Sequence, residues 1–180
     1  MKVVGISGLP GSGKSLISKL AKEKGIMVIN MGDLVREEAK KRNADVGETS
    51  IKLREEFGEY VLAKLTIEKI KNINKENNLE NIFLIEGIRS QYEIKMFKEN
   101  FKEFLLLSVF ASPKTRFNRL KNRNRNDDSS IYEEFLKRDQ RELDFGIGAV
   151  IATSDSIFIN EDSLEEYKKQ INSFFKNIIS

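Results

Sequence analysis

Apolar residues along the chain gather in short continuous runs that are separated by longer segments of helical periodicity. The runs cover residues 2–7, 26–29, 82–85, 104–110 and 156–159. Their length, their β-branched residues and the turn residues at their ends predict strands that are covered on both faces. Strands that alternate with helices predict an α/β fold with a parallel sheet and right-handed crossovers. In such a sheet, ligands bind at the carboxyl ends of the strands.

Helices are predicted between these runs, and short polar residues mark where some of them begin. Asp33 precedes a polar segment that extends to about Arg42, and it is expected to cap that helix. Residues 43–48 are expected to form a loop, after which Thr49 or Ser50 can cap the next helix. Further segments of helical period cover residues 16–24, 60–73, 91–101, 114–121, 131–143 and 164–178, with a surface turn at 74–81 and a glycine-broken segment at 145–152.

The chain is long enough to bury one hydrophobic core. It has 180 residues, of which 39% are hydrophobic, and its charged residues are spread along the whole length. It shows no linker, internal repeat or low-complexity tail, so a single domain is expected over residues 1–180. The apolar residues near the amino terminus are interrupted by glycines and resemble neither a signal peptide nor a membrane span. A cytoplasmic protein without a membrane partner is therefore expected.

Two absences restrict the chemistry that this chain can perform. The sequence contains no cysteine and no histidine. Disulfides, thiolate nucleophiles, imidazole bases and Cys/His zinc sites are therefore excluded. Catalysis would depend on Asp, Glu, Lys and Arg side chains together with a hard metal ion. The net charge is only +3, from 31 basic and 28 acidic residues, so any positive field must come from local clusters.

The segment after the first predicted strand matches the phosphate-binding pattern G-x-x-x-x-G-K-[ST]. Its residues are Gly8, Leu9, Pro10, Gly11, Ser12, Gly13, Lys14 and Ser15. In this pattern the glycines let backbone N–H groups wrap around phosphates, the lysine reaches the β and γ phosphates, and the hydroxyl holds Mg²⁺ at the start of a helix. A chance glycine-rich turn is the alternative, and the flanking strand and helix argue against it. ATP and Mg²⁺ are the expected cofactors.

Charged residues also follow the second and third predicted strands. Asp33 and Arg36 lie just beyond the second strand, where both would point toward the cleft. A helix cap and a solvated arginine are the alternative. The third strand ends in Glu86-Gly87-Ile88-Arg89. An acid there can hold a water molecule of Mg²⁺, and a glycine lets a substrate approach the backbone, whereas an ordinary strand-to-helix turn is the alternative.

Basic residues crowd into one predicted helix and the loop that follows it. They are Lys114, Arg116, Arg119, Lys121, Arg123 and Arg125, with Arg138 and Arg141 on the next helix. Such a run is often a solvated face, but beside the polar loop 122–130 it can also form a lid that lays arginines on transferring phosphates. Nucleic acid is a minor alternative, because Phe117 is the only ring in the cluster that could stack on a base.

On these motifs the chain resembles the nucleotide-kinase branch of P-loop proteins, and most closely an archaeal P-loop ATP-binding family that is similar to dephospho-CoA kinases and adenylate kinases. Gly32-Asp33-Leu34-Val35-Arg36 is similar to the G-D-x-x-R segment of adenylate kinases, and Glu86-Gly87-Ile88-Arg89 looks like their D-G-x-x-R. The resemblance implies a three-layer P-loop fold with strand order 2-3-1-4-5, in which Arg36 and Arg89 hold the acceptor. It also implies an acceptor-binding helical segment at about residues 33–73 and a helical lid at about 114–148.

Other segments resemble dephospho-CoA kinases. Asp33 is placed like the acid after the second strand of those enzymes, which implies a base that acts on a sugar hydroxyl. The segment 154–160, which ends in Asn160, resembles their carboxyl-terminal part and implies that a loop near Asn160 borders the adenine. The chain departs from both kinase groups at Glu86, where they have Asp, and at residues 145–148, which the archaeal family shares. These departures leave the acceptor open.

The preferred interpretation is a kinase that transfers the γ-phosphate of Mg·ATP to a nucleotide or a nucleotide-like small molecule. Lys14, Asp33 and Arg123 are the candidate catalytic residues, and Ser15 and Glu86 are the candidate metal ligands. The alternative is a nucleotide-dependent switch or regulatory ATPase that acts on a protein or RNA partner. The sequence leaves the oligomeric state open.

Overall fold

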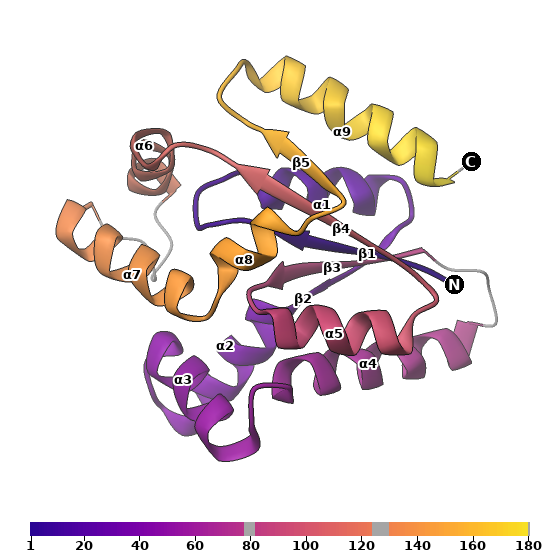
Figure 1. Cartoon of the computed structure of the whole chain (residues 1–180), viewed down its shortest axis with the longest axis horizontal. Coiled ribbons are helices and arrows are strands. Elements are labelled where there is room, and N and C mark those ends of the chain that lie inside the picture. Colours follow the sequence, from indigo (N-terminus) through magenta and orange to yellow (C-terminus); the bar gives the residue numbers. More distant parts are fainter. Residues whose placement is uncertain (78–81, 124–129, 180) are drawn as a thin grey trace.

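Five parallel strands form a sheet in the order β2-β3-β1-β4-β5 in the computed structural model, which describes residues 1–77, 82–123 and 130–179 (Figure 1). The strands are β1 (Lys2–Ser7), β2 (Met27–Asn30), β3 (Ile82–Ile88), β4 (Glu103–Phe110) and β5 (Ser156–Ile159). The α/β class and the strand order confirm the predictions made from the sequence. In a sheet of this kind the carboxyl ends of β1, β2 and β3 meet along one edge.

Helices cover both faces of the sheet, which makes a fold of three layers (Figure 1). One face is covered by α1 (Lys14–Glu23) and α9 (Leu164–Ile179). The other face is covered by α2 (Met31–Arg42), α3 (Val46–Phe57), α4 (Val61–Asn77), α5 (Gln91–Asn100) and α8 (Ile147–Ala152). Two further helices, α6 (Pro113–Arg123) and α7 (Tyr132–Asp144), lie beyond the carboxyl ends of the strands.

Successive residues of β1 pack against opposite faces of the sheet. Val3 packs with the helices of one face, and Val4 packs with α1 and α9 on the other. Successive strand side chains point to opposite faces, so a strand covered on both sides requires an unbroken apolar run. Gly5 lies where there is no room for a side chain, because a Cβ there would be 2.4 Å from Ile88 and 2.8 Å from Phe104.

The predicted cap of α2 is wrong. Asn30, the last residue of β2, caps the helix by accepting a hydrogen bond from the N–H of Gly32 at 2.8 Å. The helix therefore begins at Met31, directly after the strand, and Asp33 lies inside its first turn. A negative charge there is favourable to the helix dipole, but Asp33 does not cap the helix.

The predicted start of α3 is wrong as well. Asp45 caps this helix by accepting two backbone N–H groups of the first turn, at 2.7 and 3.0 Å. The helix begins at Val46, so the loop expected at residues 43–48 is shorter than predicted. Neither Thr49 nor Ser50 is the cap, and the hydroxyl of Thr49 instead donates to the backbone carbonyl of Asp45 at 2.7 Å.

Two predicted connections contain more helix than expected. α4 continues to Asn77, into the turn predicted at 74–81, while residues 78–81 lie outside the described part of the chain. The glycine-broken segment 145–152 contains the short α8. That helix begins after Gly146, whose φ of +94° is one that glycine adopts readily.

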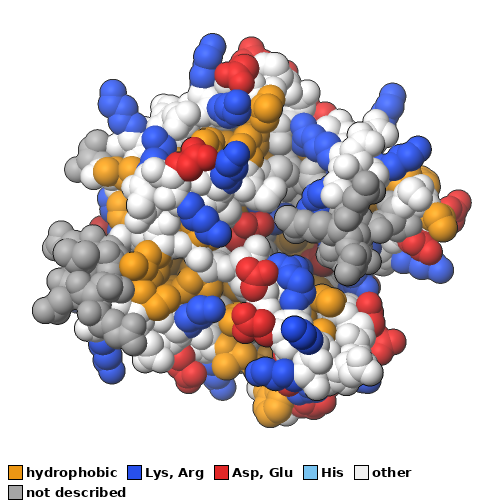
Figure 2. Space-filling view, turned by 180° about the vertical axis from the view of Figure 1, so that it is seen from behind, with side chains coloured by type: hydrophobic (Ala, Val, Ile, Leu, Met, Phe, Trp, Pro, Cys, Tyr) orange, Lys and Arg blue, Asp and Glu red, His pale blue; other side chains and the backbone are white. Residues whose placement is uncertain are grey.

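The surface carries charges of both signs. Figure 2 shows Lys and Arg side chains interspersed with Asp and Glu over the face that it presents, as the nearly balanced composition leads one to expect. Residues 124–129 of the predicted basic loop, Arg125 among them, lie outside the described residues. Within the described ranges, no helix is both long enough and apolar enough to cross a membrane.

Candidate functional site

The turn between β1 and α1 lines an open cavity at the carboxyl end of β1. Gly8, Gly11 and Gly13 all have positive φ values, which other residues rarely adopt. Space is limited as well, because a Cβ on Gly11 would lie 2.7 Å from the carbonyl oxygen of Arg116, and one on Gly13 would lie 2.2 Å from the amide nitrogen of Asn160. The glycines of the motif therefore permit the path of the backbone, and the free N–H groups at the start of α1 follow directly.

Residues that follow β5 bind the backbone carbonyl groups of this turn. The side-chain amide of Asn160 donates to the carbonyl of Ser12 at 2.8 Å, and the hydroxyl of Tyr167 donates to the carbonyl of Gly13 at 3.3 Å. Arg119 donates to the backbone carbonyl of Asn160 at 3.0 Å. Burial raises the pKa of Tyr167, so its hydroxyl remains a donor. Asn160 is buried against the turn, and the expectation that its loop borders the adenine stays a prediction.

Lys14 points its ammonium group back at the turn. Its Nζ donates to the carbonyl oxygens of Gly8, at 2.6 Å, and Leu9, at 3.1 Å. Burial lowers the pKa of Lys14 to about 8, while the carboxylates of Glu86 and Glu142 oppose that change. The hydrogen bonds of a buried ammonium become stronger when negatively charged phosphate oxygens replace neutral carbonyl oxygens as its acceptors. This geometry suits the phosphate-binding role that the motif predicts.

A cavity of about 600 Å³ opens in front of the turn and extends to α2, α3 and α7. Its basic residues are Lys14, Arg36, Arg89, Arg119, Arg123, Lys137, Arg138 and Arg141. The carboxylates of its described wall are Asp45, Glu86, Glu134 and Glu142. Such an excess of positive charge favours a ligand that carries several negative charges.

Oxygen atoms suited to a magnesium ion lie beside Lys14. Ser15 and Glu86 both line the cavity. Glu86 lies near the carboxyl end of β3, opposite Ile6 of β1, and it accepts a hydrogen bond from the Ser18 hydroxyl at 2.5 Å. In phosphoryl-transfer sites Mg²⁺ uses one or two protein carboxylates or hydroxyls together with phosphate oxygens and water, so these residues fit such an ion. Their service as metal ligands stays a prediction.

The structure separates Asp33 from the cavity that Arg36 lines. The two side chains form an ion pair within α2, with 2.5 Å between Nη2 of Arg36 and Oδ1 of Asp33. The Asp33 side chain is 58% exposed, and Asp33 is not among the described residues that line the cavity. Asp33 therefore holds Arg36, and its service as a base stays a prediction.

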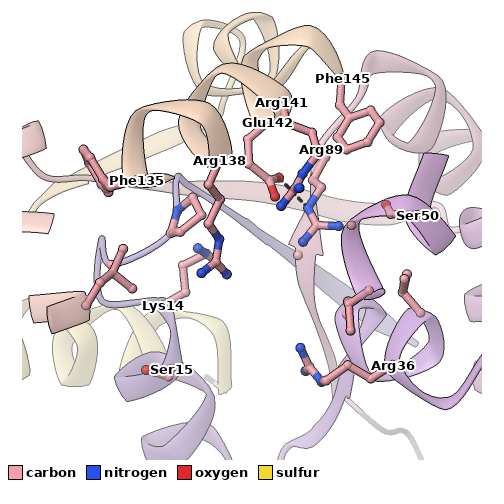
Figure 3. A pocket seen from close by; sticks show the side chains of 18 of the residues that line it. Lys14, Ser15, Arg36, Ser50, Arg89, Phe135, Arg138, Arg141, Glu142 and Phe145 are labelled. Carbon is pink, nitrogen blue, oxygen red and sulfur yellow. Dashed lines mark ion pairs between the residues drawn. The ribbon is translucent and has the colours of Figure 1, made fainter. Parts of the chain in front are cut away.

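Arg89 meets a carboxylate that the sequence analysis did not single out. Its Nε lies 2.7 Å from Oε2 of Glu142 on α7, and the Glu142 side chain is only 4% exposed. Figure 3 shows this pair in the middle of the cavity, with Lys14 to one side. Glu142 follows Phe135 and Asp139 at helical spacing, and all three residues are buried. The spacing of these residues is visible in the sequence. Because two of the three are acidic, however, the stripe is not apolar and does not predict a buried helix face.

A second buried ion pair holds the backbone beside Arg89. Glu93 is fully buried, and its Oε2 accepts the N–H of Arg89 at 2.7 Å. Its Oε1 accepts a hydrogen bond from Nη2 of Arg54 at 3.0 Å. The Arg54 guanidinium also lies 4.3 Å from the centre of the Phe145 ring, between α7 and α8. Helix α3, the start of α5 and the end of α7 are therefore joined at one point, which the sequence analysis missed.

The cations of the predicted basic helix occupy different environments. Arg116 is 2% exposed, and its guanidinium contacts both carboxylate oxygens of Asp139 on α7, at 2.7 and 2.5 Å. It also donates to the carbonyl of Pro10 at 3.3 Å, so it links the phosphate-binding turn to α7. Arg119 and Arg123 line the cavity. The cations of α6 are therefore neither all solvated nor all placed to contact a ligand.

A parallel sheet of this order with a phosphate-binding loop after its first strand defines a P-loop kinase-like fold. The solved shikimate kinase from Bacteroides thetaiotaomicron shares it, with a TM-score of 0.64 and 14% identity over 99% of both chains. The sequence also matches the family described as the AAA domain over residues 7–136.

The chain belongs to the UPF0200 family. The UPF0200 protein of Methanothermobacter thermautotrophicus is 47% identical over 99% of this chain and 91% of its own length. The UPF0200 protein MmarC7_0527 of Methanococcus maripaludis strain C7 is 44% identical over 99% of this chain and 98% of its own length. These relatives confirm the resemblance to an archaeal P-loop family, and the fold implies that the protein binds a nucleotide.

Proposed function

We propose that this protein is a kinase that transfers the γ-phosphate of Mg·ATP to an anionic small molecule. The observation that carries the proposal is a single cavity that is lined by Lys14 of the P-loop and by two arginines of the predicted acceptor side, Arg36 and Arg89. A protein that only bound a nucleotide would need the lysine but not these arginines. The fold that the chain shares with a solved shikimate kinase supports the same class of reaction.

The donor nucleotide would bind at residues 8–15. Its phosphates would replace the carbonyls of Gly8 and Leu9 as the partners of Lys14. Ser15 and Glu86 would hold the magnesium ion, which neutralises charge on the phosphate oxygens when it is bound. Phosphoryl transfer requires little covalent chemistry, so the protein contributes mainly by positioning the reactants and neutralising charge.

The acceptor would lie between the predicted acceptor-binding segment, residues 33–73, and the predicted lid, residues 114–148. Arg36 and Arg89 would bind its negative charge, as arginine does in carboxylate and phosphate sites. A nucleotide or nucleotide-like molecule, of the dephospho-CoA or nucleoside monophosphate type, carries such charge. Arg123 would act on the γ-phosphate from the lid, where one well-placed arginine contributes roughly 10³–10⁵ in rate.

A coupled assay of ADP release tests this proposal. The protein is supplied with Mg·ATP and a panel of acceptors that includes dephospho-CoA, nucleoside monophosphates, nucleosides and shikimate. Lys14→Met serves as the blank because it removes the phosphate-binding ammonium. Lys19→Met is the matched control, since Lys19 is an exposed residue of the same helix. We expect one acceptor to accelerate ADP release in the wild type and in this control but not in the blank.

Nucleotide binding is measured separately by calorimetry with a non-hydrolysable analogue of Mg·ATP. Binding without stimulation by any acceptor would contradict the kinase and would favour a nucleotide-dependent switch that acts on a protein or RNA partner. If the wild type does not bind the analogue, both the kinase function and the nucleotide-dependent switch are contradicted.

A further inference from the structure

Glu142 has a position that phosphate binding does not explain. Its buried carboxylate contacts Arg89 on the predicted acceptor side of the cavity, 2.7 Å from Nε. Figure 3 shows it pointing into the same space as Lys14. We propose that Glu142 orients an acceptor hydroxyl and takes its proton, so that the acceptor group is an alcohol and not a phosphate. The inference rests on the proposed kinase function and specifies the chemistry of its acceptor.

The other carboxylates in the described wall of the cavity have different tasks or positions. Asp45 caps α3 by accepting two backbone N–H groups. Glu86 accepts a hydrogen bond from Ser18 of α1 at 2.5 Å, on the donor side of the cavity. Glu134 is exposed to solvent. Among these carboxylates Glu142 is the buried one, and it is the one that contacts an arginine of the acceptor side.

An acceptor phosphate conflicts with this carboxylate. A phosphate bound to Arg89 would bring its charged oxygens against Glu142, and like charges repel strongly where one of them, here the Glu142 carboxylate, is buried. An alcohol carries no charge, and its O–H can donate to Glu142. Negative charge elsewhere on the acceptor would then bind Arg36 and Arg141, which line the same cavity, and Arg89 would hold Glu142 instead of the anionic group. The cavity therefore fits an alcohol whose anionic group lies at a distance from the reacting hydroxyl.

The surroundings of Glu142 connect it to the donor and the acceptor sides. Asp139, one turn earlier in α7, is held by Arg116, which also donates to the carbonyl of Pro10 in the P-loop. The backbone of Arg89, the partner of Glu142, is held by its own hydrogen bond to a buried glutamate. A general base has to be positioned relative to both reactants, and these contacts supply that positioning.

The reaction balances without a further reactant. The hydroxyl oxygen of the acceptor forms a bond to the γ-phosphorus as the bond from that phosphorus to the β–γ bridging oxygen breaks. ADP leaves with the electron pair of the broken bond, and the hydroxyl proton passes to Glu142 and then to solvent. The products are a phosphate ester, ADP and a proton.

A phosphate titration tests the repulsion without an identified acceptor. The protein is saturated with Mg·AMP-PNP to fill the donor site, and inorganic phosphate is titrated by calorimetry. Glu142→Gln removes the charge but keeps the shape, and it should bind phosphate at least about tenfold more tightly than the wild type. Glu142→Asp keeps the charge, and Glu133→Gln makes the same change at an exposed position of α7, so both should bind as weakly as the wild type. Equal or weaker binding by Glu142→Gln would mean that Glu142 only supports Arg89, and would overturn the proposal.

Turnover tests the proton transfer. With an alcohol acceptor, kcat of Glu142→Gln should fall about 10²–10⁴-fold while the KM for ATP stays that of the wild type. Full kcat in this variant would overturn the proposal. So would a wild-type enzyme that phosphorylates a nucleoside monophosphate on its phosphate in preference to every alcohol, a result that needs no variant. If no acceptor is turned over, the kinase function is refuted instead, and the phosphate titration still decides whether Glu142 repels an anion.

Discussion

Replacing Lys14 by methionine is expected to stabilise the empty protein, although it removes the phosphate-binding charge. Burial lowers the Lys14 pKa from 10.5 to about 8, so holding this charge in the folded protein at neutral pH costs about 3 kcal/mol at most. The hydrogen bonds from Nζ to the carbonyls of Gly8 and Leu9 return about 1 kcal/mol each. The net expectation is a Lys14→Met protein that is more stable by about 1 kcal/mol at neutral pH.

The sign of the pH dependence follows from the protons that each state binds. Between pH 8 and pH 10.5 the unfolded chain keeps the Lys14 proton while the folded protein loses it, so the stability of the wild type rises with pH there. Lys14→Met lacks this rise, and its advantage should shrink above pH 8. Tyr167 has a raised pKa, so it lowers stability only above its ordinary value of 10.0. Measurements below pH 10 therefore isolate the lysine.

Urea denaturation of both proteins, at pH values from neutral to just below 10, measures this difference. Lys19→Met is the control, because its exposed side chain on the same helix should give no pH-dependent difference. A Lys14→Met protein that is clearly less stable than the wild type at neutral pH would contradict the expected cost of burying this charge. So would a difference in stability between the two proteins that stays constant as the pH rises.

Three further substitutions test other parts of the site. Arg116→Met should lower the free energy of unfolding by about 3 kcal/mol, because it leaves the Asp139 carboxylate buried without its partner; urea denaturation measures this. Gly13→Ala should abolish nucleotide binding in calorimetry, since its φ is +110° and a Cβ would lie 2.2 Å from a neighbouring amide nitrogen. Asp33→Asn should leave kcat near that of the wild type, because Asp33 lies outside the cavity and only holds Arg36. A large loss of kcat in steady-state kinetics would instead support Asp33 as the base.

The sheet was predictable because its strands are unbroken apolar runs that a doubly covered parallel sheet requires. The third strand was predicted too short, because Glu86 and Gly87 interrupt the apolar run before the strand ends at Ile88. The helix caps were less predictable. Both Asn30 and Asp33 can cap α2, and the choice depends on how far β2 pairs with β3, which is a contact between distant segments.

The P-loop was predictable because its chemistry depends on consecutive residues. The buried charges were not, because each depends on a partner that another element supplies. Arg54 and Glu93 are 39 positions apart, and nothing in the local sequence of either marks it as buried. Glu142 is one of many charged residues on α7, and only the fold shows that it faces Arg89.

The phosphate-binding turn joins the first and the last segments of the chain. Asn160 and Tyr167 bind the carbonyls of Ser12 and Gly13 across 148 and 154 positions of sequence. Contacts between such distant residues raise the contact order and form slowly, because closing long loops costs entropy. During synthesis the turn therefore lacks its support until α9 has left the ribosome. We therefore expect nucleotide binding to require the completed domain and not only the amino-terminal segment that carries the motif.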